Sequence, residues 1–215
     1  MSNANLSWIS DEGINSLLDN LIVNIRNIHG NALVKVSKNV EDPFLLMCIA
    51  AAYGIRDVEK LKEQGTYHSV STAISSALGR FHQDVLGKVQ RFVNHDAGYD
   101  LENTERKILA EIKNKHNTMN ASNRERVVDN LKTALKSRPG YRGYLVITIP
   151  RKNIRYEANL GNRLFETDGA SFYALATGER DALKQLYRVL EKRLCANAPD
   201  IADYCRQAFE RGIPE

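Results

Sequence analysis

Three residues in the middle of the chain have the types and spacing of a metal-dependent hydrolytic site. Asp100 is followed by ten residues and then by Glu111-Ile112-Lys113. Side chains alternate along a β-strand, so Glu111 and Lys113 would lie on one face and Ile112 on the other. If the chain folds back as a hairpin around residues 104–106, Asp100 lies opposite Glu111 on the neighbouring strand. Because Mg²⁺ prefers oxygen ligands, two converging carboxylates predict a magnesium site.

The chemistry that suits this set is the hydrolysis of a phosphodiester. The reaction needs a cation that stabilises the developing negative charge and a water that is held in line and deprotonated. Asp100 and Glu111 are predicted to hold Mg²⁺, with the backbone carbonyl of Ile112 as a third ligand. Lys113 is predicted to contact the attacking water and the phosphate, where its compact charge lowers the water's pKa. The alternative interpretation is an exposed hairpin edge on which Glu111 and Lys113 merely form a surface ion pair.

The elements predicted around these residues follow a definite order. From residue 69 the patterns indicate a helix, three short strands, a second helix and a strand buried on both faces. The first helix is expected at 69–90, and the three short strands at 92–93, 99–101 and 108–113. The second helix is expected to start at a capping box of Ser122 and Glu125, and the buried strand is expected at 144–149. This αβββαβ order resembles the common core of PD-(D/E)XK nucleases. We therefore predict an α/β (α+β) fold with a mixed sheet flanked by helices and a helical N-terminal extension.

The first part of the chain is predicted to be helical. A helix beginning at Ser10-Asp11 is expected to break at Gly30, and Asp42-Pro43 is expected to begin a second helix that runs to Gly54. Because residues 44–53 form an apolar block, we expect this second helix to be buried.

The last part of the chain is predicted to add smaller elements. The patterns favour a strand at 172–176, a charged amphipathic helix at 180–194 and a short helix after Pro199. Together the patterns predict three parts: a helical region 1–68 packed on the core, a nuclease core 69–195 and a C-terminal helix 196–215.

The charge of the chain is distributed unevenly. The 215 residues are 43% hydrophobic, which is enough for a core, and the net charge is only +4. Residues 100–163 carry 14 Lys and Arg against 7 Asp and Glu, whereas the remainder carries 16 against 19. The basic excess surrounds the predicted metal site, where a phosphate backbone would lie. The alternative interpretation is a set of solvated helix faces.

A bacterial cytoplasmic setting is expected. The sequence has no apolar run of about 18 residues, and its first residues are polar rather than basic and then apolar, so neither a membrane span nor a secretory signal is predicted. Cys48, Cys195 and Cys205 form an odd, sparse set without metal-ligand spacing, which favours a reducing compartment.

Several polar residues near the predicted site are candidates for DNA contacts. Some follow the 108–113 strand directly, some follow the 144–149 strand and one lies on the helix before the site. Their side chains suit contacts with base edges and phosphates. The candidates are His82, Asn114, Lys115, His116, Asn117, Arg151 and Lys152. For each, an exposed position without function is an alternative interpretation.

Gln83 and Asp84, on the helix that precedes the strands, are candidates for an additional ligand of the metal site. A solvent-exposed helical position explains either residue equally well. His116-Asn117 does not by itself indicate the His-Asn type of metal finger, because no second His stands at ligand spacing.

A longer match narrows the resemblance to one family. Gly98–Asn103 and Ala110–Thr118 resemble the type II restriction endonucleases that cut GGNCC-type sites. In that family a Gly-aromatic-Asp is followed by acid-x-Lys-Asn-Lys-His-Asn-Thr. The segment Leu78–Gly87 also looks like the family's helix before the motif. Tyr99 stands where many PD-(D/E)XK enzymes have Pro, and the chain looks somewhat short for the family.

The resemblance implies a type II site-specific deoxyribonuclease that cleaves both strands of a short palindromic site. It implies Asp100, Glu111 and Lys113 as the catalytic residues and Mg²⁺ as the cofactor, for which Mn²⁺ can substitute. A two-fold site calls for a two-fold protein, so a homodimer is expected. The other expected partners are double-stranded DNA and a companion methyltransferase of a restriction-modification system, which acts on the same site without stable contact. No membrane partner is expected.

Three other interpretations of the sequence stay open. The same core would suit a structure-specific or repair nuclease that cuts branched or damaged DNA without a defined sequence. It would also suit a catalytically silent DNA-binding protein, although the intact Asp-Glu-Lys triplet argues against this. The third is a helical regulatory module formed by residues 1–90, with an incidental motif.

Overall fold

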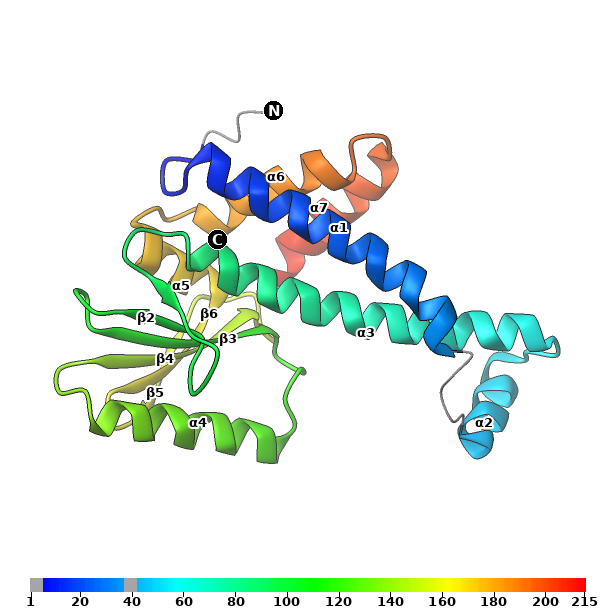
Figure 1. The fold of residues 1–215 in the computed structure, drawn as a ribbon, viewed down its shortest axis with the longest axis horizontal. Helices are drawn as coiled ribbons and strands as arrows, with labels where there is room; N and C mark the ends of the chain where they lie inside the picture. Colours follow the sequence, from blue (N-terminus) through cyan, green and yellow to red (C-terminus); the bar gives the residue numbers. More distant parts are fainter. Residues whose placement is uncertain (1–5, 37–41) are drawn as a thin grey trace. The chain divides into compact units, whose positions relative to one another are not determined.

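The protein has a mixed α/β fold, shown in Figure 1 as a computed structural model that describes residues 6–36 and 42–215. It divides into two compact units. The first unit consists of the described residues of Met1–Leu18 together with Gly79–Glu215. The second unit consists of the described residues of Asp19–Leu78. The first unit contains a six-stranded mixed sheet flanked by helices, which confirms the predicted fold class.

Two of the first helices are longer than predicted. The helix α1, Asp11–Val36, continues through Gly30, so the predicted break there is wrong. A glycine inside a helix costs only about 1 kcal/mol relative to alanine, which a long helix tolerates. The helix α3, Val58–Leu86, begins well before residue 69, because Asp57 caps it by accepting bonds from the backbone N–H groups of Glu59 and Lys60.

The ends of helix α2, Pro43–Tyr53, are as predicted. The Asp42 carboxylate accepts bonds from the first backbone N–H groups, and Gly54 ends the helix in the left-handed region at φ 63°. The expectation that this helix is buried is wrong, since none of its residues is buried and Phe44 is 74% exposed. Apolar composition favours burial but does not itself supply a surface to pack against.

The predicted αβββαβ core is present. After α3 come the strands β1 and β2, the long strand β3, the helix α4 and the strand β4. The sheet order is β1-β2-β3-β4-β6-β5, in which β1 to β3 are antiparallel and α4 connects the parallel neighbours β3 and β4. The ranges are Val93–Asn94 (β1), Leu101–Asn103 (β2), Ile108–Lys115 (β3), Ala121–Lys136 (α4) and Arg142–Ile149 (β4).

The start of α4 differs slightly from the prediction. The N-cap residue is Asn120 rather than Ser122, and its side-chain oxygen accepts the backbone N–H of Asn123 at 2.9 Å. Asn and Ser both cap helices well, so two nearby candidates are separated only by the geometry of the turn.

The predicted strand at 172–176 is part of a helix instead. Helix α5 spans Gly169–Thr177; Asp168 caps it, and Gly178 ends it at φ 80°. A short apolar run does not distinguish a strand from a buried helix by periodicity. The α5 backbone runs so close to β4 that a Cβ on Gly169 would lie 2.6 Å from the carbonyl oxygen of Thr148.

The hairpin of β5 (Glu157–Gly161) and β6 (Leu164–Asp168) was not predicted. Its two-residue turn places Asn162 and Arg163 at φ 54° and 64°, as a type I′ turn requires. The β6 strand pairs in parallel with β4 and carries polar side chains next to the centre of the sheet.

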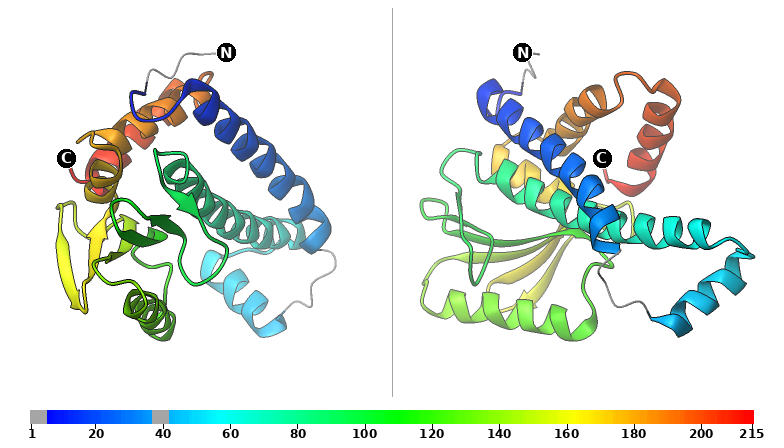
Figure 2. Two further views of the ribbon diagram at one scale, coloured as in Figure 1. Left: turned by 60° about the vertical axis from the view of Figure 1, so that its left-hand side comes forward. Right: turned by 45° about the vertical axis from the view of Figure 1, so that its right-hand side comes forward.

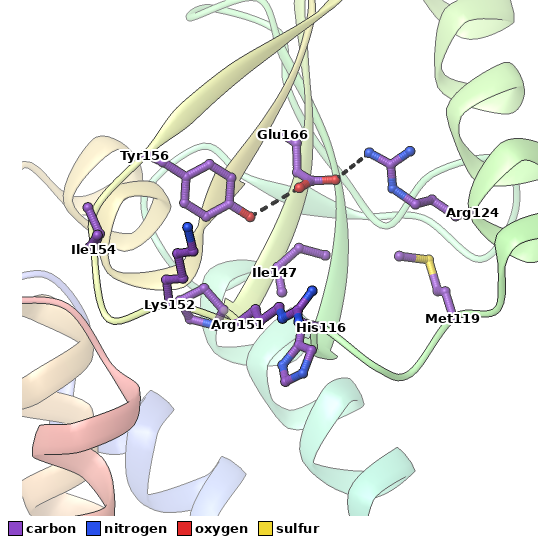
Figure 3. Close-up of a pocket in the computed structure, with 10 residues that line it drawn as sticks. His116, Met119, Arg124, Ile147, Arg151, Lys152, Ile154, Tyr156 and Glu166 are labelled. Atoms are coloured by element: carbon purple, nitrogen blue, oxygen red, sulfur yellow. Dashed lines mark hydrogen bonds and ion pairs between the residues drawn. The ribbon is translucent and has the colours of Figure 1, made fainter.

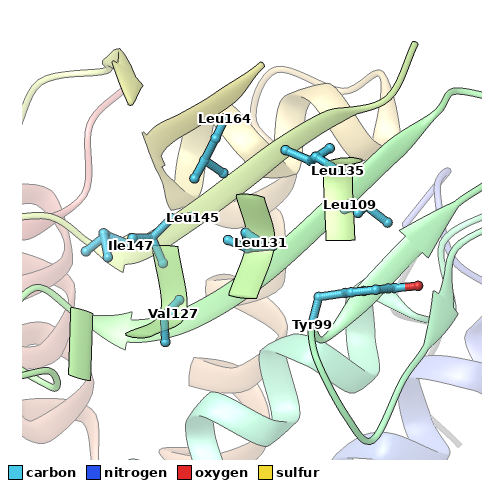
Figure 4. Packing of buried hydrophobic residues seen from close by; sticks show 8 residues of the cluster. All are labelled: Tyr99, Leu109, Val127, Leu131, Leu135, Leu145, Ile147 and Leu164. Carbon is cyan, nitrogen blue, oxygen red and sulfur yellow. The ribbon is translucent and has the colours of Figure 1, made fainter. Parts of the chain in front are cut away.

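Helices cover both faces of the sheet, as Figures 1 and 2 show. On one face, α4 packs on β3 and β4 through eight buried residues (Figure 4): Tyr99, Leu109, Val127, Leu131, Leu135, Leu145, Ile147 and Leu164. On the other face, Tyr144 of β4 contacts Phe172 of α5, with ring centroids 5.5 Å apart. Burial of β4 on both faces confirms the prediction made from its continuous apolar run.

Helices α6, Ala182–Leu194, and α7, Pro199–Gly212, lie close to their predicted ranges. Near the start of the described chain, the Trp8 indole N–H donates to the Gln185 side chain at 2.8 Å, which ties this segment to α6. Across residues 6–36 and 42–215, no helix combines the length and the apolar character that a bilayer crossing requires.

Candidate active site

Strand β3 presents Glu111 and Lys113 on one face and an apolar row on the other. Ile108, Ala110 and Ile112 are almost fully buried, whereas the side chains of Glu111 and Lys113 are 14% and 25% exposed to solvent. The alternation follows from the pleat of the strand. The acid and the base therefore reach a partly open surface from a strand that is anchored on its opposite face.

The β2–β3 hairpin places Asp100 beside Glu111. Leu101 pairs with Ala110 across the antiparallel ladder, and the Asp100 backbone N–H donates to the Ala110 carbonyl oxygen at 3.0 Å. The turn lies between Asn103 and Ile108, around the residues expected from the sequence. Asp100 thus occupies the position opposite Glu111.

The Asp100 carboxylate is held by one backbone bond and crowded by one negative charge. It accepts the Ile112 backbone N–H at 2.6 Å. Burial, and next to it the negative charge of Glu111, raise the pKa of Asp100 from its usual value near 4 to about 6, against the opposing effects of the Ile112 bond, Lys113 and Arg80. A bound cation would relieve this repulsion.

Lys113 and Glu111 form an ion pair, with 2.6 Å between the Lys113 Nζ and the Glu111 Oε1. Both side chains are partly buried, so solvent screens this pair less than an exposed pair. The ammonium is thereby held at the Glu111 carboxylate rather than extended into solvent.

The donor set fits a hard divalent cation. Among the described residues no group of three His, Cys, Asp or Glu side chains could hold a metal ion. Asp100 and Glu111 offer two carboxylates, and the Ile112 carbonyl follows on the same strand as Glu111. Two carboxylates, a carbonyl and water are the ligands that Mg²⁺ takes at phosphate-processing sites.

Comparison with known proteins decides the family. Residues 6–196 match the family described as Eco47II restriction endonuclease. This chain belongs to the Eco47II restriction endonuclease family. It is 32% identical over 204 residues to the type II restriction enzyme Eco47II of Escherichia coli, covering 86% of this chain and 84% of that protein.

A second relative supports the same assignment. The type II restriction enzyme Sau96I of Staphylococcus aureus is 27% identical over 205 residues, covering 86% of this chain and 78% of that protein. No solved structure matches the chain significantly. The predicted resemblance and the predicted enzyme class, a type II restriction endonuclease, are thus confirmed at the level of the family.

In this restriction endonuclease, Gln83 supports the Asp100 backbone. Its buried side-chain amide donates to the carbonyl oxygens of His95 at 3.4 Å and of Asp100 at 3.3 Å, and the His95 N–H donates to the same Asp100 oxygen at 2.9 Å. Gln83 therefore positions the segment just before β2 that carries Asp100.

The Asp84 carboxylate, on α3, contacts two other side chains. It accepts from the Asn94 amide at 3.1 Å and lies 3.9 Å from the Arg80 guanidinium. Burial raises the pKa of Asp84. Its role as an additional metal ligand stays a prediction.

His82 lies in the interior of the enzyme. Its Nδ1 lies 2.9 Å from the Tyr173 hydroxyl, and burial lowers the pKa of His82 to about 4, so the ring is neutral at ordinary pH. A buried neutral ring has no path to a DNA surface in this arrangement. His82 is therefore not among the residues that we propose to contact DNA.

A polar cluster beside Asp100 was not found from the sequence. The Tyr99 hydroxyl donates to Glu102 at 2.6 Å, and the Arg138 guanidinium donates to Tyr99 at 2.8 Å and to Glu102 at 3.3 Å. Tyr99 and Glu102 flank Asp100 on the chain, and their bonds to Arg138 tie its hairpin to the end of α4. The Gly-Tyr-Asp motif hinted at a role for Tyr99, but nothing in the sequence indicates the partner Arg138.

The remaining predicted DNA contacts lie at or beyond the carboxyl ends of β3 and β4, with Asn114 and Lys115 as the last two residues of β3. Lys115, His116 and Asn117 are exposed, and the His116 backbone N–H donates to the Ile149 carbonyl oxygen at 3.1 Å. The structure thus brings the segment after β3 next to the loop after β4, which carries Arg151 and Lys152.

A pocket of about 390 Å³ opens where these two segments meet (Figure 3). The sequence analysis had selected three of its residues, His116, Arg151 and Lys152. It had selected none of the others, which come from β4 and the loop after it, from α4 and the loop before it, and from the unpredicted strand β6. The remaining lining residues are Met119, Arg124, Ile147, Pro150, Ile154, Tyr156 and Glu166.

Proposed function

We propose that this protein is a Mg²⁺-dependent type II restriction endonuclease that cleaves both strands of a short palindromic, GGNCC-like site in double-stranded DNA. The observation that supports it most is the meeting of Asp100, Glu111 and Lys113 on one partly open surface, with the pKa of Asp100 raised to about 6 by burial and the neighbouring Glu111 charge. Family membership supplies the substrate class.

The proposed roles follow from the positions of the side chains. Asp100 and Glu111, with the Ile112 carbonyl, would hold Mg²⁺, which when bound polarises the phosphate and lowers the pKa of a water. Lys113 would contact the attacking water and a phosphate oxygen, and its positive charge would offset the charge that develops there. The water would lose a proton to solvent as its oxygen bonds to phosphorus, the bond from phosphorus to the 3′ oxygen would break, and that oxygen would take up a proton from solvent.

Each chain carries one such candidate site, whereas a palindromic cut needs two. A homodimer places two identical sites on the two strands, and two-fold symmetry then matches protein to DNA. We propose that the enzyme acts in the bacterial cytoplasm, where Cys48, Cys195 and Cys205, all free thiols, stay reduced. A companion methyltransferase would protect the host DNA.

The experiment that tests this function is digestion of unmethylated phage DNA with Mg²⁺, and in parallel with EDTA, followed by sequencing of the fragment ends. Discrete Mg²⁺-dependent fragments ending at GGNCC are expected. A smear, or cutting only at branched DNA, would favour a structure-specific nuclease. Absence of cleavage with any divalent metal, combined with retained DNA binding, would favour a silent DNA-binding protein.

Two substitutions test the assigned residues. Glu111→Ala and Lys113→Ala should each lower cleavage by at least about 100-fold, since each removes a group that acts on the reacting phosphate, while DNA binding persists. Glu125→Ala and Lys192→Ala, at exposed positions on α4 and α6, are matched controls that should cut normally. Full cleavage by Glu111→Ala would refute the site assignment.

A further inference from the structure

The pocket beyond β3 and β4 lies on the same face of the sheet as the candidate active site. Lys113 pairs with Ile147, which lines the pocket, and Glu111 pairs with Leu145, which pairs in turn with Glu166 of β6. Partners in a parallel ladder point to the same face. The pocket therefore begins one strand away from Lys113, at a lateral distance of about 5 to 10 Å.

One arginine of the pocket is held in a fixed orientation. The Arg124 guanidinium donates to Glu166 Oε2 at 2.7 Å, and the Tyr156 hydroxyl donates to the other carboxylate oxygen at 3.3 Å, as the dashed lines in Figure 3 show. The Glu166 side chain is only 20% exposed. A guanidinium held by a partly buried carboxylate loses less freedom when it binds a ligand.

The pocket has an excess of positive charge. The lining includes three cationic side chains, those of Arg124, Arg151 and Lys152, and a single carboxylate, that of Glu166. His116 also lines the pocket. None of the described residues forms an ion pair with Arg151 or Lys152. The charge left uncompensated by Glu166 is available to an anion.

We propose that this pocket is an anion subsite that takes a backbone phosphodiester of the DNA, within about three nucleotides of the scissile phosphate. The estimate follows from the lateral distance to Lys113 and the rise of about 3.4 Å per nucleotide. This proposal rests on the proposed function. It adds Arg124, Glu166 and Tyr156 to the DNA-binding residues, with Arg124 as the direct contact and Glu166 as its positioning residue.

The shape of the pocket favours a phosphate over a base. The phosphates are the outermost anions of a duplex and can enter a concave site, whereas base edges are recessed in the grooves and are reached by protruding side chains. The apolar lining, including Met119 and Ile154, leaves room for the sugar carbons next to the phosphate. A phosphate contact fixes the register of the duplex and so places the scissile phosphate at Lys113.

The experiment is a double-mutant cycle between the protein and single neutral phosphates. Binding of metal-free protein to its cleavage site is measured with duplexes that carry one methylphosphonate at each position in turn. Arg124→Ala should weaken binding to unmodified DNA by about tenfold or more. At one position near the cut, the methylphosphonate should weaken wild-type binding by a similar factor but have little effect on Arg124→Ala.

Two further variants keep the test decisive. If Arg124→Ala fails to fold, the exposed Arg151→Ala and Lys152→Ala double variant replaces it, because it should show the same coupling. Lys192→Ala is the control and should show coupling at no position. A second series of duplexes carries 7-deazaguanine in place of single guanines.

Several outcomes would overturn the proposal. Coupling to no phosphate would refute it, and coupling only to a 7-deazaguanine would show a base contact instead. If wild-type protein binds and cuts its site but these couplings are missing, only the subsite fails. If wild-type protein binds no DNA, the proposed function fails and the subsite with it.

Discussion

Asp100 is the residue in which the electrostatics of the site are most visible. Its carboxylate accepts one backbone N–H of the hairpin and its own backbone N–H pairs with Ala110, while burial and Glu111 make its ionised form unfavourable in the metal-free protein. Like-charge pairs of this kind are common at functional sites, where a ligand later supplies the missing opposite charge. Metal binding and protein stability should therefore be linked through this carboxylate.

Asp100→Asn should stabilise the metal-free protein at high pH. The pKa of Asp100 is raised in the folded state to about 6, so the folded protein binds more protons than the unfolded chain between about pH 4 and 6. Wild-type stability should fall across that window by up to about 2 kcal/mol, and the variant should not show this loss.

Urea denaturation in EDTA at pH 4 and at pH 8 measures the difference. The variant should exceed wild type at pH 8 and not at pH 4, and Mg²⁺ should stabilise wild type alone. Equal stability of the two proteins at both pH values would contradict the assigned cause.

Tyr99 links Asp100 to α4 through its hydroxyl. Tyr99→Phe removes the two hydrogen bonds of the Tyr99 hydroxyl and keeps only the bond between Arg138 and Glu102. The substitution should therefore lower the free energy of unfolding by about 1 to 2 kcal/mol. Because the hairpin carries Asp100, cleavage should also fall, mainly through weaker Mg²⁺ binding. Denaturant unfolding and Mg²⁺ titrations of cleavage check both effects; an unchanged Mg²⁺ dependence would restrict the cluster to a role in stability.

At the scale of elements, the β2–β3 hairpin and the helix α4 both position the candidate site. The hairpin brings Asp100 to Glu111, and α4 covers the apolar part of the same sheet face with Val127, Leu131 and Leu135. The two ends of α4 are also occupied, since Arg124 lies in the pocket and Arg138, just after the helix, bonds to Tyr99.

Gly169→Ala tests the close packing of α5 against β4. A Cβ at this position would lie 2.6 Å from the Thr148 carbonyl oxygen, a backbone atom that cannot move aside cheaply, so a loss of about 2 to 3 kcal/mol is expected. Gly30→Ala is the matched control. It lies inside α1 with no atom within 4 Å of its added Cβ, and it should gain up to about 1 kcal/mol.

Thermal or urea unfolding of the two variants measures these changes. A destabilised Gly30→Ala variant would show that the helix does not continue through this residue as described. Wild-type stability in Gly169→Ala would show that α5 and β4 can separate without cost.

At the scale of the whole molecule, the basic excess of residues 100–163 should dominate DNA affinity. Phosphate contacts release counterions, so the logarithm of the binding constant should fall steeply and linearly with the logarithm of the salt concentration. The Arg151→Ala and Lys152→Ala double variant should reduce the slope by about 1, since both residues line the one proposed phosphate subsite and each phosphate contact contributes about one unit.

Titration of labelled duplex at several salt concentrations gives the two slopes. The Lys192→Ala variant should keep the wild-type slope because α6 is not part of the proposed DNA surface. A flat dependence for wild type would contradict a binding surface built on phosphates.

The sequence alone was sufficient for what depends on local spacing. The alternation of Glu111 and Lys113, the αβββαβ order and the caps at Asp42 and Gly54 follow from pleat, periodicity and turn chemistry, which act over a few residues. The family resemblance also depended on short strings around Asp100 and Lys113. These are the features that the structure and the comparisons confirm.

Only the tertiary structure decided what depends on partners distant in the chain. The burial of His82 against Tyr173, the cluster of Arg138 with Tyr99, and the pairing of Arg124 with Glu166 join residues separated by 36 or more positions. The exposure of α2 and the helical state of 172–176 were decided in the same way, since an apolar run has no intrinsic preference between a strand and a buried helix. Local patterns specify elements, whereas the sheet order β3-β4-β6 specifies which polar groups meet. That is why the pocket beside the candidate active site could not be found from the sequence.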